Sequence, residues 1–253
     1  MLRRRLVSAP LIVVLLVVSS AAAKAGEPRA LIELFTGQGC SSCPPADKLL
    51  GDLAADPSVV ALSLPIDYWD YLGWKDTLAI PGHSSRQRAY ARVRGDREVY
   101  TPQIVVNGAT HVLGSDKAAV ERAIAQTDRN AAVMSVPILI SVGGGTLNVH
   151  IVAAKEHASG EVWLCPVSRA IPVEVERGEN RGHTITYHDV VRSWLKLGDF
   201  AGDDETFSVS VPQILREGID AAAIVVQQGT KEKPGIVLGA AMAPVGSQSS
   251  ETR

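Results

Sequence analysis

Two cysteines separated by two residues stand between a buried strand and an amphipathic helix, and this junction constrains the fold more than any other feature. The preceding run "RALIELF" predicts a buried strand, which Gly37 and Gly39 end. Two prolines follow Cys40 and Cys43, and proline is well tolerated in a first helical turn. Apolar residues then recur at helical spacing: Ala46, Leu49, Leu50 and Leu53. The sequence therefore predicts the cysteine pair at a helix N-terminus.

That position suits thiol chemistry. The partial positive charge of a helix N-terminus favours a thiolate over a thiol, and the thiolate is the form that attacks disulfides. In this geometry the first cysteine is usually the exposed attacker and the second resolves the intermediate. We therefore predict Cys40 and Cys43 as a catalytic pair, acting on a protein or small-molecule thiol or disulfide client.

Two other interpretations of the pair stay open. An inert disulfide is one, although so short a loop removes little entropy from the unfolded chain. A zinc or copper site is the other, but a structural zinc site needs four ligands and the chain has no second CxxC. Only His183 and His188 have a spacing that suits metal ligands. We expect no cofactor and no metal.

The segments that follow predict a layered α/β domain. Residues 59–67 form a second apolar run, and residues 103–113 predict a hairpin whose turn is Asn107-Gly108. A further helix is predicted with one apolar face: Val120, Ala123, Ile124 and Thr127. Thr101-Pro102 lies just before the hairpin, where proline is tolerated because it starts a strand.

Five stretches of the chain resemble one family, the secreted, thioredoxin-like proteins catalogued as domain of unknown function 1223 (DUF1223). They read "ELFTGQGCSSCPPAD", "DYWDYLGWKD", "RQRAYA", "VYTPQIVVNG" and "RGENRGHTITYHDVVR". The resemblance implies a thioredoxin-like fold, a redox pair, and a cis Thr101-Pro102 bond facing the CxxC turn. The chain departs from ordinary thioredoxins at Gly39, where they carry Trp, and at Ser41-Ser42, where they carry Gly-Pro. The direction of electron flow therefore does not carry over.

An aromatic- and arginine-rich helical insert is predicted at about residues 68–100. It holds Tyr68, Trp69, Tyr71, Trp74, Tyr90 and Tyr100. These aromatic residues fit either a lid over the cysteine pair or a packed insertion. We interpret its arginines, Arg86 among them, as a solvated basic face. Glu33, seven residues before Cys40, is a candidate proton acceptor if strand alternation does not turn it away.

From residue 131 onward the pattern changes to short strands separated by Gly, Asp and Pro. Such runs predict an antiparallel β-sandwich-like domain over residues 131–243, after a thioredoxin-like domain over residues 26–130. We expect Cys165 to be a buried core residue because Val, Trp and Leu precede it. Residues 244–253 are polar and predict a disordered tail.

The N-terminus predicts export. Three arginines, an apolar run over residues 11–18 and the A-x-A pattern Ala23-Lys24-Ala25 indicate a signal peptide at residues 1–25. An uncleaved anchor is the alternative, but the apolar run is short for a membrane span. We expect a periplasmic or secreted protein without stable membrane insertion. The formal net charge of −2 gives no basic excess that would favour nucleic acid.

Overall fold

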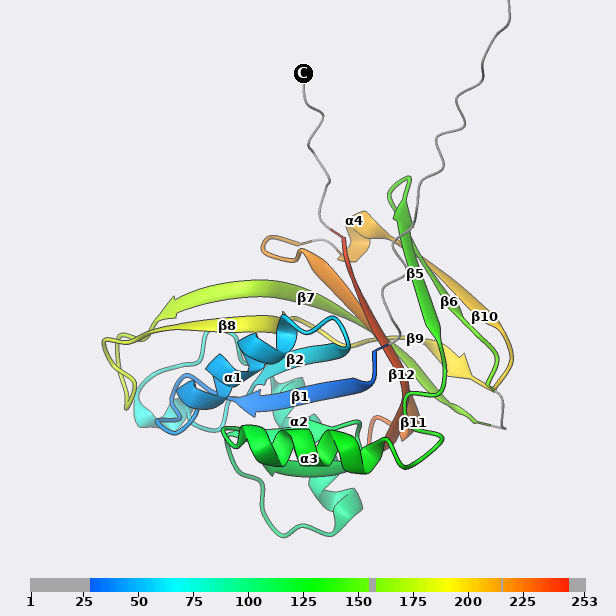
Figure 1. Cartoon of the computed structure of the whole chain (residues 1–253). Coiled ribbons are helices and arrows are strands. Elements are labelled where there is room, and N and C mark those ends of the chain that lie inside the picture. Colours follow the sequence, from blue (N-terminus) through cyan, green and yellow to red (C-terminus); the bar gives the residue numbers. More distant parts are fainter. Residues whose placement is uncertain (1–27, 155–157, 215, 246–253) are drawn as a thin grey trace, which may run out of the picture.

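The computed structural model describes residues 28–154, 158–214 and 216–245 (Figure 1). The predicted signal peptide and residues 246–253 of the predicted tail lie outside this range. In the described part of the chain, each helix is too short or too polar to cross a membrane.

The first half alternates strands and helices in the predicted order. Its elements are β1 (Ala30–Thr36), α1 (Pro44–Ala54), β2 (Val59–Pro65), η1 (Asp70–Leu72), α2 (Pro81–Arg94), β3 (Gln103–Val106), β4 (Thr110–Leu113) and α3 (Lys117–Thr127). The hairpin turn is at Asn107-Gly108, as predicted, and both residues have positive φ angles. The segment predicted as a helical insert contains η1 and α2.

The second half is almost entirely β-structure. Its elements are β5 (Ile138–Gly143), β6 (Thr146–Ile151), β7 (Gly160–Glu174), β8 (Thr184–Val191), β9 (Leu195–Phe200), β10 (Glu205–Ser210), α4 (Val211–Ile214), β11 (Ala221–Thr230) and β12 (Lys233–Pro244). The sequence patterns did not indicate β9 or β12. Strand β12 extends to the first residue of the segment predicted as a tail.

One large mixed sheet joins strands from both halves of the chain. Its order is β12-β11-β7-β8-β2-β1-β3-β4, and β9 also pairs with β7. The contacts β1–β2 and β2–β8 are parallel, and the other pairs of this sheet are antiparallel. A separate antiparallel sheet has the order β10-β6-β5. The fold class is thus mixed α/β, with a large mixed sheet and a smaller antiparallel one.

Helices cover both faces of the large sheet, because alternate residues of β1 point to opposite sides. Ile32 and Leu34 pack with residues of α1 and α3. Leu31 and Phe35 pack in a different core that contains Tyr90 of α2. In Figure 1, α1 and α3 accordingly lie in front of the sheet and α2 lies behind it.

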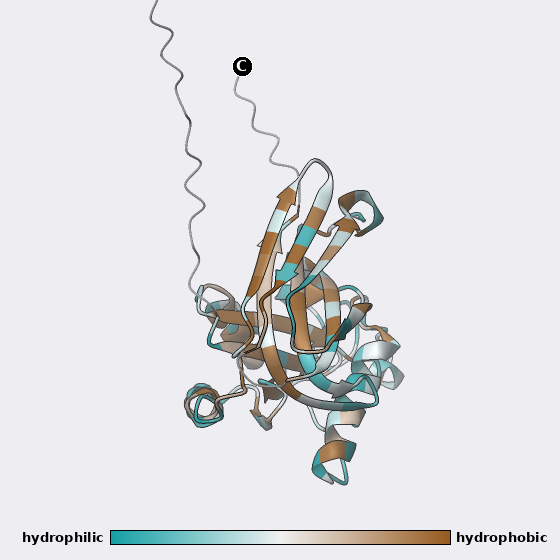
Figure 2. Ribbon diagram, turned by 90° about the vertical axis from the view of Figure 1, so that its right-hand side faces the viewer, coloured by the Kyte–Doolittle hydropathy of each residue, from teal (hydrophilic) through white to brown (hydrophobic). Residues whose placement is uncertain are grey.

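The smaller sheet packs against the β7, β11 and β12 end of the large sheet. Buried side chains of β6 alternate with half-buried ones, as a strand with a single covered face requires. Figure 2 shows the matching alternation of hydropathy, brown against white to teal, along one of the strands at the top of the view. The shared core includes Leu147 and Val149 of β6, Val162 of β7 and Ile224 of β11.

The large sheet is continuous across residue 131, the predicted domain boundary. Strand β8, from the second half, pairs with β2, from the first, through Ser63 and Val190. The two halves therefore share one sheet. The division of the chain into two domains at residue 131 stays a prediction. The sequence suggests that the runs "EVWLCPV" and "PVEVERGE" are two strands. The first run lies wholly within β7, and residues 172–174 of the second run are the end of the same strand.

Candidate functional site

The cysteine pair lies where the predicted strand-to-helix junction placed it. Cys40 and Cys43 form a disulfide with Cα atoms 5.4 Å apart, and α1 begins at the next residue, Pro44. The Cys43 carbonyl accepts the backbone N–H groups of Ala46 at 2.8 Å and Asp47 at 3.1 Å. The disulfide thus caps a helix whose first-turn dipole favours negative charge on a reduced sulfur.

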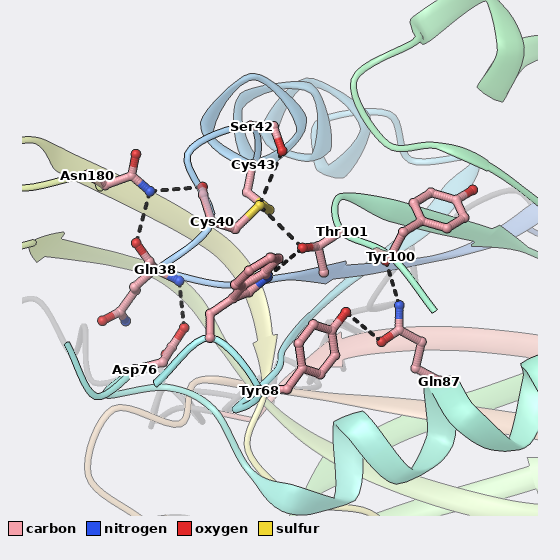
Figure 3. Close-up of a disulfide and its surroundings, with 11 residues drawn as sticks. Gln38, Cys40, Ser42, Cys43, Tyr68, Asp76, Gln87, Tyr100, Thr101 and Asn180 are labelled. Carbon is pink, nitrogen blue, oxygen red and sulfur yellow. Dashed lines mark hydrogen bonds between the residues drawn. A yellow bond between two sulfur atoms is a disulfide. The ribbon is translucent and has the colours of Figure 1, made fainter. Parts of the chain in front are cut away.

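Thr101 contacts the disulfide directly. The Thr101-Pro102 bond is cis, as the family resemblance implied. The Thr101 hydroxyl donates to Cys40 Sγ at 3.3 Å (Figure 3). The indole Nε1 of Trp69 donates in turn to the Thr101 hydroxyl oxygen at 2.8 Å. Trp69 therefore orients the hydroxyl group, and the hydroxyl hydrogen points at the sulfur.

Gly39 allows the insert to approach the disulfide loop closely. A Cβ atom at this position would lie 2.9 Å from Trp69 Cβ, closer than real Cβ contacts. The Trp of ordinary thioredoxins therefore does not fit at position 39 unless Trp69 moves. Of the two interpretations of the insert aromatics, packing holds for Tyr90, which is 1% exposed, and for Trp69, which is half-buried against the same core; a lid over the cysteine pair stays a prediction.

A residue from the second half of the chain holds the other side of the loop that carries the disulfide. The side-chain amide of Asn180, between β7 and β8, donates to the carbonyl oxygens of Gln38 and Cys40, each at 2.9 Å (Figure 3). The Gln38 backbone N–H donates to Asp76 Oδ2 at 2.7 Å. The stretch "RGENRGH" thus contributes a site residue, Asn180, that the sequence analysis did not single out.

The expectation that Cys40 is exposed is wrong. Its exposed fraction is 3%, and that of Cys43 is 0%. Trp69 packs over Gly39 and reaches the Cys40 sulfur through Thr101, and Asn180 holds the backbone of the loop; such long-range contacts are not visible in the local pattern. Because both cysteines are buried, a client reaches the sulfur atoms only if surrounding segments move.

A buried carboxyl group lies one helical turn beyond Cys43. Asp47 is 2% exposed, and neither of its oxygens has a hydrogen-bond partner within the described residues. Burial raises the pKa of Asp47 to about 8; the nearby Thr36 hydroxyl opposes this shift without reaching hydrogen-bond geometry, and Asp76 adds to it. The signal missed in the sequence was a charged residue next to the apolar positions of α1.

Glu33 is not a proton acceptor for the cysteine pair. Its carboxylate accepts Arg86 Nε and the Tyr90 hydroxyl, each at 2.6 Å, on the α2 side of the sheet. Strand alternation therefore turns it away from α1. The interpretation of Arg86 as solvated is also wrong, because its side chain is 7% exposed and forms an ion pair with Glu33.

The remaining candidates lie apart from the disulfide. His183 contacts the Asn180 carbonyl oxygen through Nδ1 at 3.2 Å, and His188 packs against Gly51 of α1. In the part of the chain that the structure describes, no three His, Cys, Asp or Glu residues are grouped to hold a metal ion. Cys165 is a buried free thiol, as predicted, and burial raises its pKa.

A groove of about 410 Å³ runs from the disulfide end of α1 along β8. Pro44, next to Cys43, forms one end of its lining. The helix contributes Lys48, Gly51 and Asp52, and the strand contributes residues 184–186 and 188. The groove gives a neighbouring molecule space between α1 and β8, and neither cysteine lines it.

Fold and site together define a mixed α/β protein with a buried disulfide at a helix N-terminus beside a cis-proline loop. The family described as "Protein of unknown function (DUF1223)" matches residues 31–227, and the chain belongs to this family. The chain is also similar to a protein from Agrobacterium tumefaciens solved by X-ray crystallography. The two are 28% identical with a TM-score of 0.77, over 90% of this chain and 99% of the other. No curated protein matches the chain.

Proposed function

We propose that this chain is an exported, thioredoxin-like thiol–disulfide oxidoreductase that uses Cys40 and Cys43. The observation that carries the proposal is the Thr101 hydroxyl, which donates to Cys40 Sγ while Trp69 holds its oxygen. A hydrogen bond to sulfur stabilises a thiolate more than a disulfide. The helix N-terminus acts in the same direction. A disulfide that is only structural does not require either feature.

The exchange proceeds through a mixed disulfide. A client thiolate attacks Cys40 Sγ, the bond to Cys43 breaks, and Cys43 leaves as a thiolate. A second client thiolate then attacks the client sulfur and releases Cys40 as a thiolate. Two electrons pass from the client dithiol to the cysteine pair, and the reverse sequence oxidises the pair.

Proton balance assigns a role to Asp47 in this proposal. The Cys43 thiolate forms in a fully buried position, so it takes up a proton to avoid the free-energy penalty of a buried charge. Asp47 lies four residues further along the same helix, and burial raises its pKa to about 8. A carboxyl group with this pKa is protonated near neutral pH and is able to supply that proton.

One observation favours a second candidate, a non-catalytic binding module with a structural disulfide. Both sulfur atoms are almost completely buried, and the Asn180 amide fixes the loop backbone. In this alternative the groove between α1 and β8 binds a ligand, and the disulfide only holds its rim.

Trapping separates the two candidates. In the full chain, Cys43→Ser leaves Cys40 able to attack a client disulfide, as in the reverse sequence, but removes the Cys43 thiolate that would then break the mixed disulfide on Cys40. We expect the oxidoreductase to accumulate disulfide-linked clients, seen on a non-reducing gel and lost after reduction. Cys165→Ser is the matched control, since a buried thiol of raised pKa is inert.

The thermal midpoints of the variants provide the second readout. A catalytic pair closes too short a loop to contribute much stability, so Cys43→Ser should fold nearly as well as the wild type. If Cys43→Ser captures no client and loses substantial stability, the binding-module candidate replaces the oxidoreductase.

A further inference from the structure

A second cavity, of about 170 Å³, opens at the start of α2 and is independent of the proposed redox function. Four separate segments contribute to its lining: the first turns of α2, strand β7, the β8–β9 connection and the β11–β12 turn. The lining residues that carry the argument are Gly82, Arg86, Trp163, Ser193, Trp194 and Lys231.

Arg86 is a buried cation, and one nitrogen of its guanidinium forms no hydrogen bond with the described residues. Its Nε donates to Glu33 at 2.6 Å, and its Nη2 donates to the Tyr90 hydroxyl and to Gln227 Oε1, each at 2.8 Å. No hydrogen bond among the described residues involves Nη1. The side chain is only 7% exposed and lines the cavity, so Nη1 is a fixed donor left for a bound group.

Two further positive groups lie at the same cavity. Lys231 adds a positive charge at the rim, where its neighbour Glu232 accepts a hydrogen bond from Thr230. The 14-residue helix α2 begins after Ile80, which has no capping side chain, so its positive dipole end is also free.

The charge balance and shape of the cavity define the ligand class. No acidic side chain lines it in the described part of the chain, and Glu33 lies on the other side of the Arg86 guanidinium as its ion-pair partner. The walls are indole rings: Trp163 and Trp194 meet edge to face at 6.3 Å, and Arg86 lies 4.1 Å over the Trp194 ring centre. The volume is below that of sites for drug-sized ligands and fits a single small ring.

We propose that this cavity binds a small organic acid, with its carboxylate on Arg86 Nη1 and its apolar body against the indole walls. Lys231 attracts the anion at the rim. Arginine holds carboxylates through directed hydrogen bonds, and its ion pair with Glu33 fixes the guanidinium before the ligand arrives.

Calorimetric titration of the full chain with benzoate tests this site. We expect saturable binding with a Kd of roughly 1 mM or tighter, within reach of a ligand of this size. Benzyl alcohol has the same ring without the charge, and it should bind at least about ten-fold more weakly, because charge-assisted hydrogen bonds are the stronger ones.

Two variants locate the binding. A Cβ at Gly82 meets only Ile80 Cδ1, at 3.8 Å, so Gly82→Leu is accommodated and places its side chain in the cavity mouth; it should abolish benzoate binding. Lys231→Ala should weaken binding about two- to five-fold, as expected for an exposed charge. Lys233→Ala, at the start of β12 and outside the lining, should leave it unchanged.

Three results would overturn the proposal: no saturable benzoate binding, equal affinity for benzyl alcohol, or full affinity in Gly82→Leu. If Gly82→Leu does not fold, the comparison of Lys231→Ala with Lys233→Ala decides, and equal affinities count against the site.

Discussion

The side-chain amide of Asn180 donates to the carbonyl oxygen of Cys40 at 2.9 Å, although 140 positions separate the two residues in the chain. The same nitrogen donates to Gln38 at an equal distance. The connection between β7 and β8 therefore holds the backbone on which the disulfide lies. Any motion that exposes Cys40 on this side has to break both hydrogen bonds.

Asn180→Ala should loosen this cover. The substitution leaves two buried carbonyl groups without their donor, so we expect the free energy of unfolding to fall by about 1–3 kcal/mol. The rate at which a phosphine reduces the disulfide should rise several-fold, because the loop opens more easily. Quenching the reduction at a series of times and labelling the free thiols measures that rate.

Glu179→Ala is the matched control, since Glu179 is an exposed neighbour in the same loop. Its reduction rate should equal that of the wild type. An unchanged rate in Asn180→Ala, together with lost stability, would mean that the amide supports the fold without controlling access.

Thr101→Val tests the hydrogen bond to sulfur. Valine keeps the shape of threonine and removes the hydroxyl that donates to Cys40 Sγ at 3.3 Å. In the reduced protein this donor favours the thiolate, so its loss should raise the pKa of the Cys40 thiol. The measurement is the alkylation rate of the reduced protein against pH, whose midpoint should move upward.

Thr110→Val, on a half-buried position of β4, is the control and should leave the midpoint in place. If the two variants titrate alike, the Thr101 hydroxyl does not act on the reduced sulfur.

Local patterns predicted the elements next to the cysteine pair well. The strand before Cys40, the helix after Cys43 and the Asn107-Gly108 hairpin all lie where turn chemistry and apolar spacing indicated. The four predicted apolar positions of α3 are its buried ones. Each of these features depends on residues within one or two turns of each other.

Features that depend on pairing between distant segments could not be predicted from the sequence. The apolar runs ended one strand at Val167 and began another at Pro172, yet residues 160–174 form the single strand β7, in which Pro172 is paired with β8 alone. The burial of Cys40 and the role of Asn180 likewise follow from the register of strands far apart in the chain. Local periodicity carries no information on such contacts.

Glu33→Gln should destabilise the protein without affecting the disulfide. It leaves the Arg86 guanidinium buried without a counter-charge, and breaking a buried pair in this way costs roughly 3–5 kcal/mol. Urea unfolding measures the loss. Glu121→Gln, in an exposed pair with Lys117 at 4.0 Å, is the control and should cost less than about 0.5 kcal/mol.

The phosphine reduction rate of Glu33→Gln should match that of the wild type, since Glu33 lies on the opposite face of the sheet from α1. A large change in that rate would reinstate Glu33 as part of the redox site.

Asp47→Asn should make the protein more stable at alkaline pH than the wild type. The pKa of Asp47 is raised from 3.8 to about 8 by burial, so between these values the folded state binds more protons than the unfolded state. The stability of the wild type therefore falls as pH rises through this window, by on the order of 1 kcal/mol per pH unit at its middle. The Asn variant has no proton to lose and should not show this slope.

Urea unfolding at a series of pH values distinguishes the two proteins. Their stabilities should converge near about pH 4 and diverge toward about pH 8, with Asp47→Asn the more stable. Asp52→Asn changes an exposed carboxyl on the same helix and should follow the wild type. Parallel pH profiles for the wild type and Asp47→Asn would show that the carboxyl is not held protonated, and Asp47 would then lose its proposed role as the proton donor to Cys43.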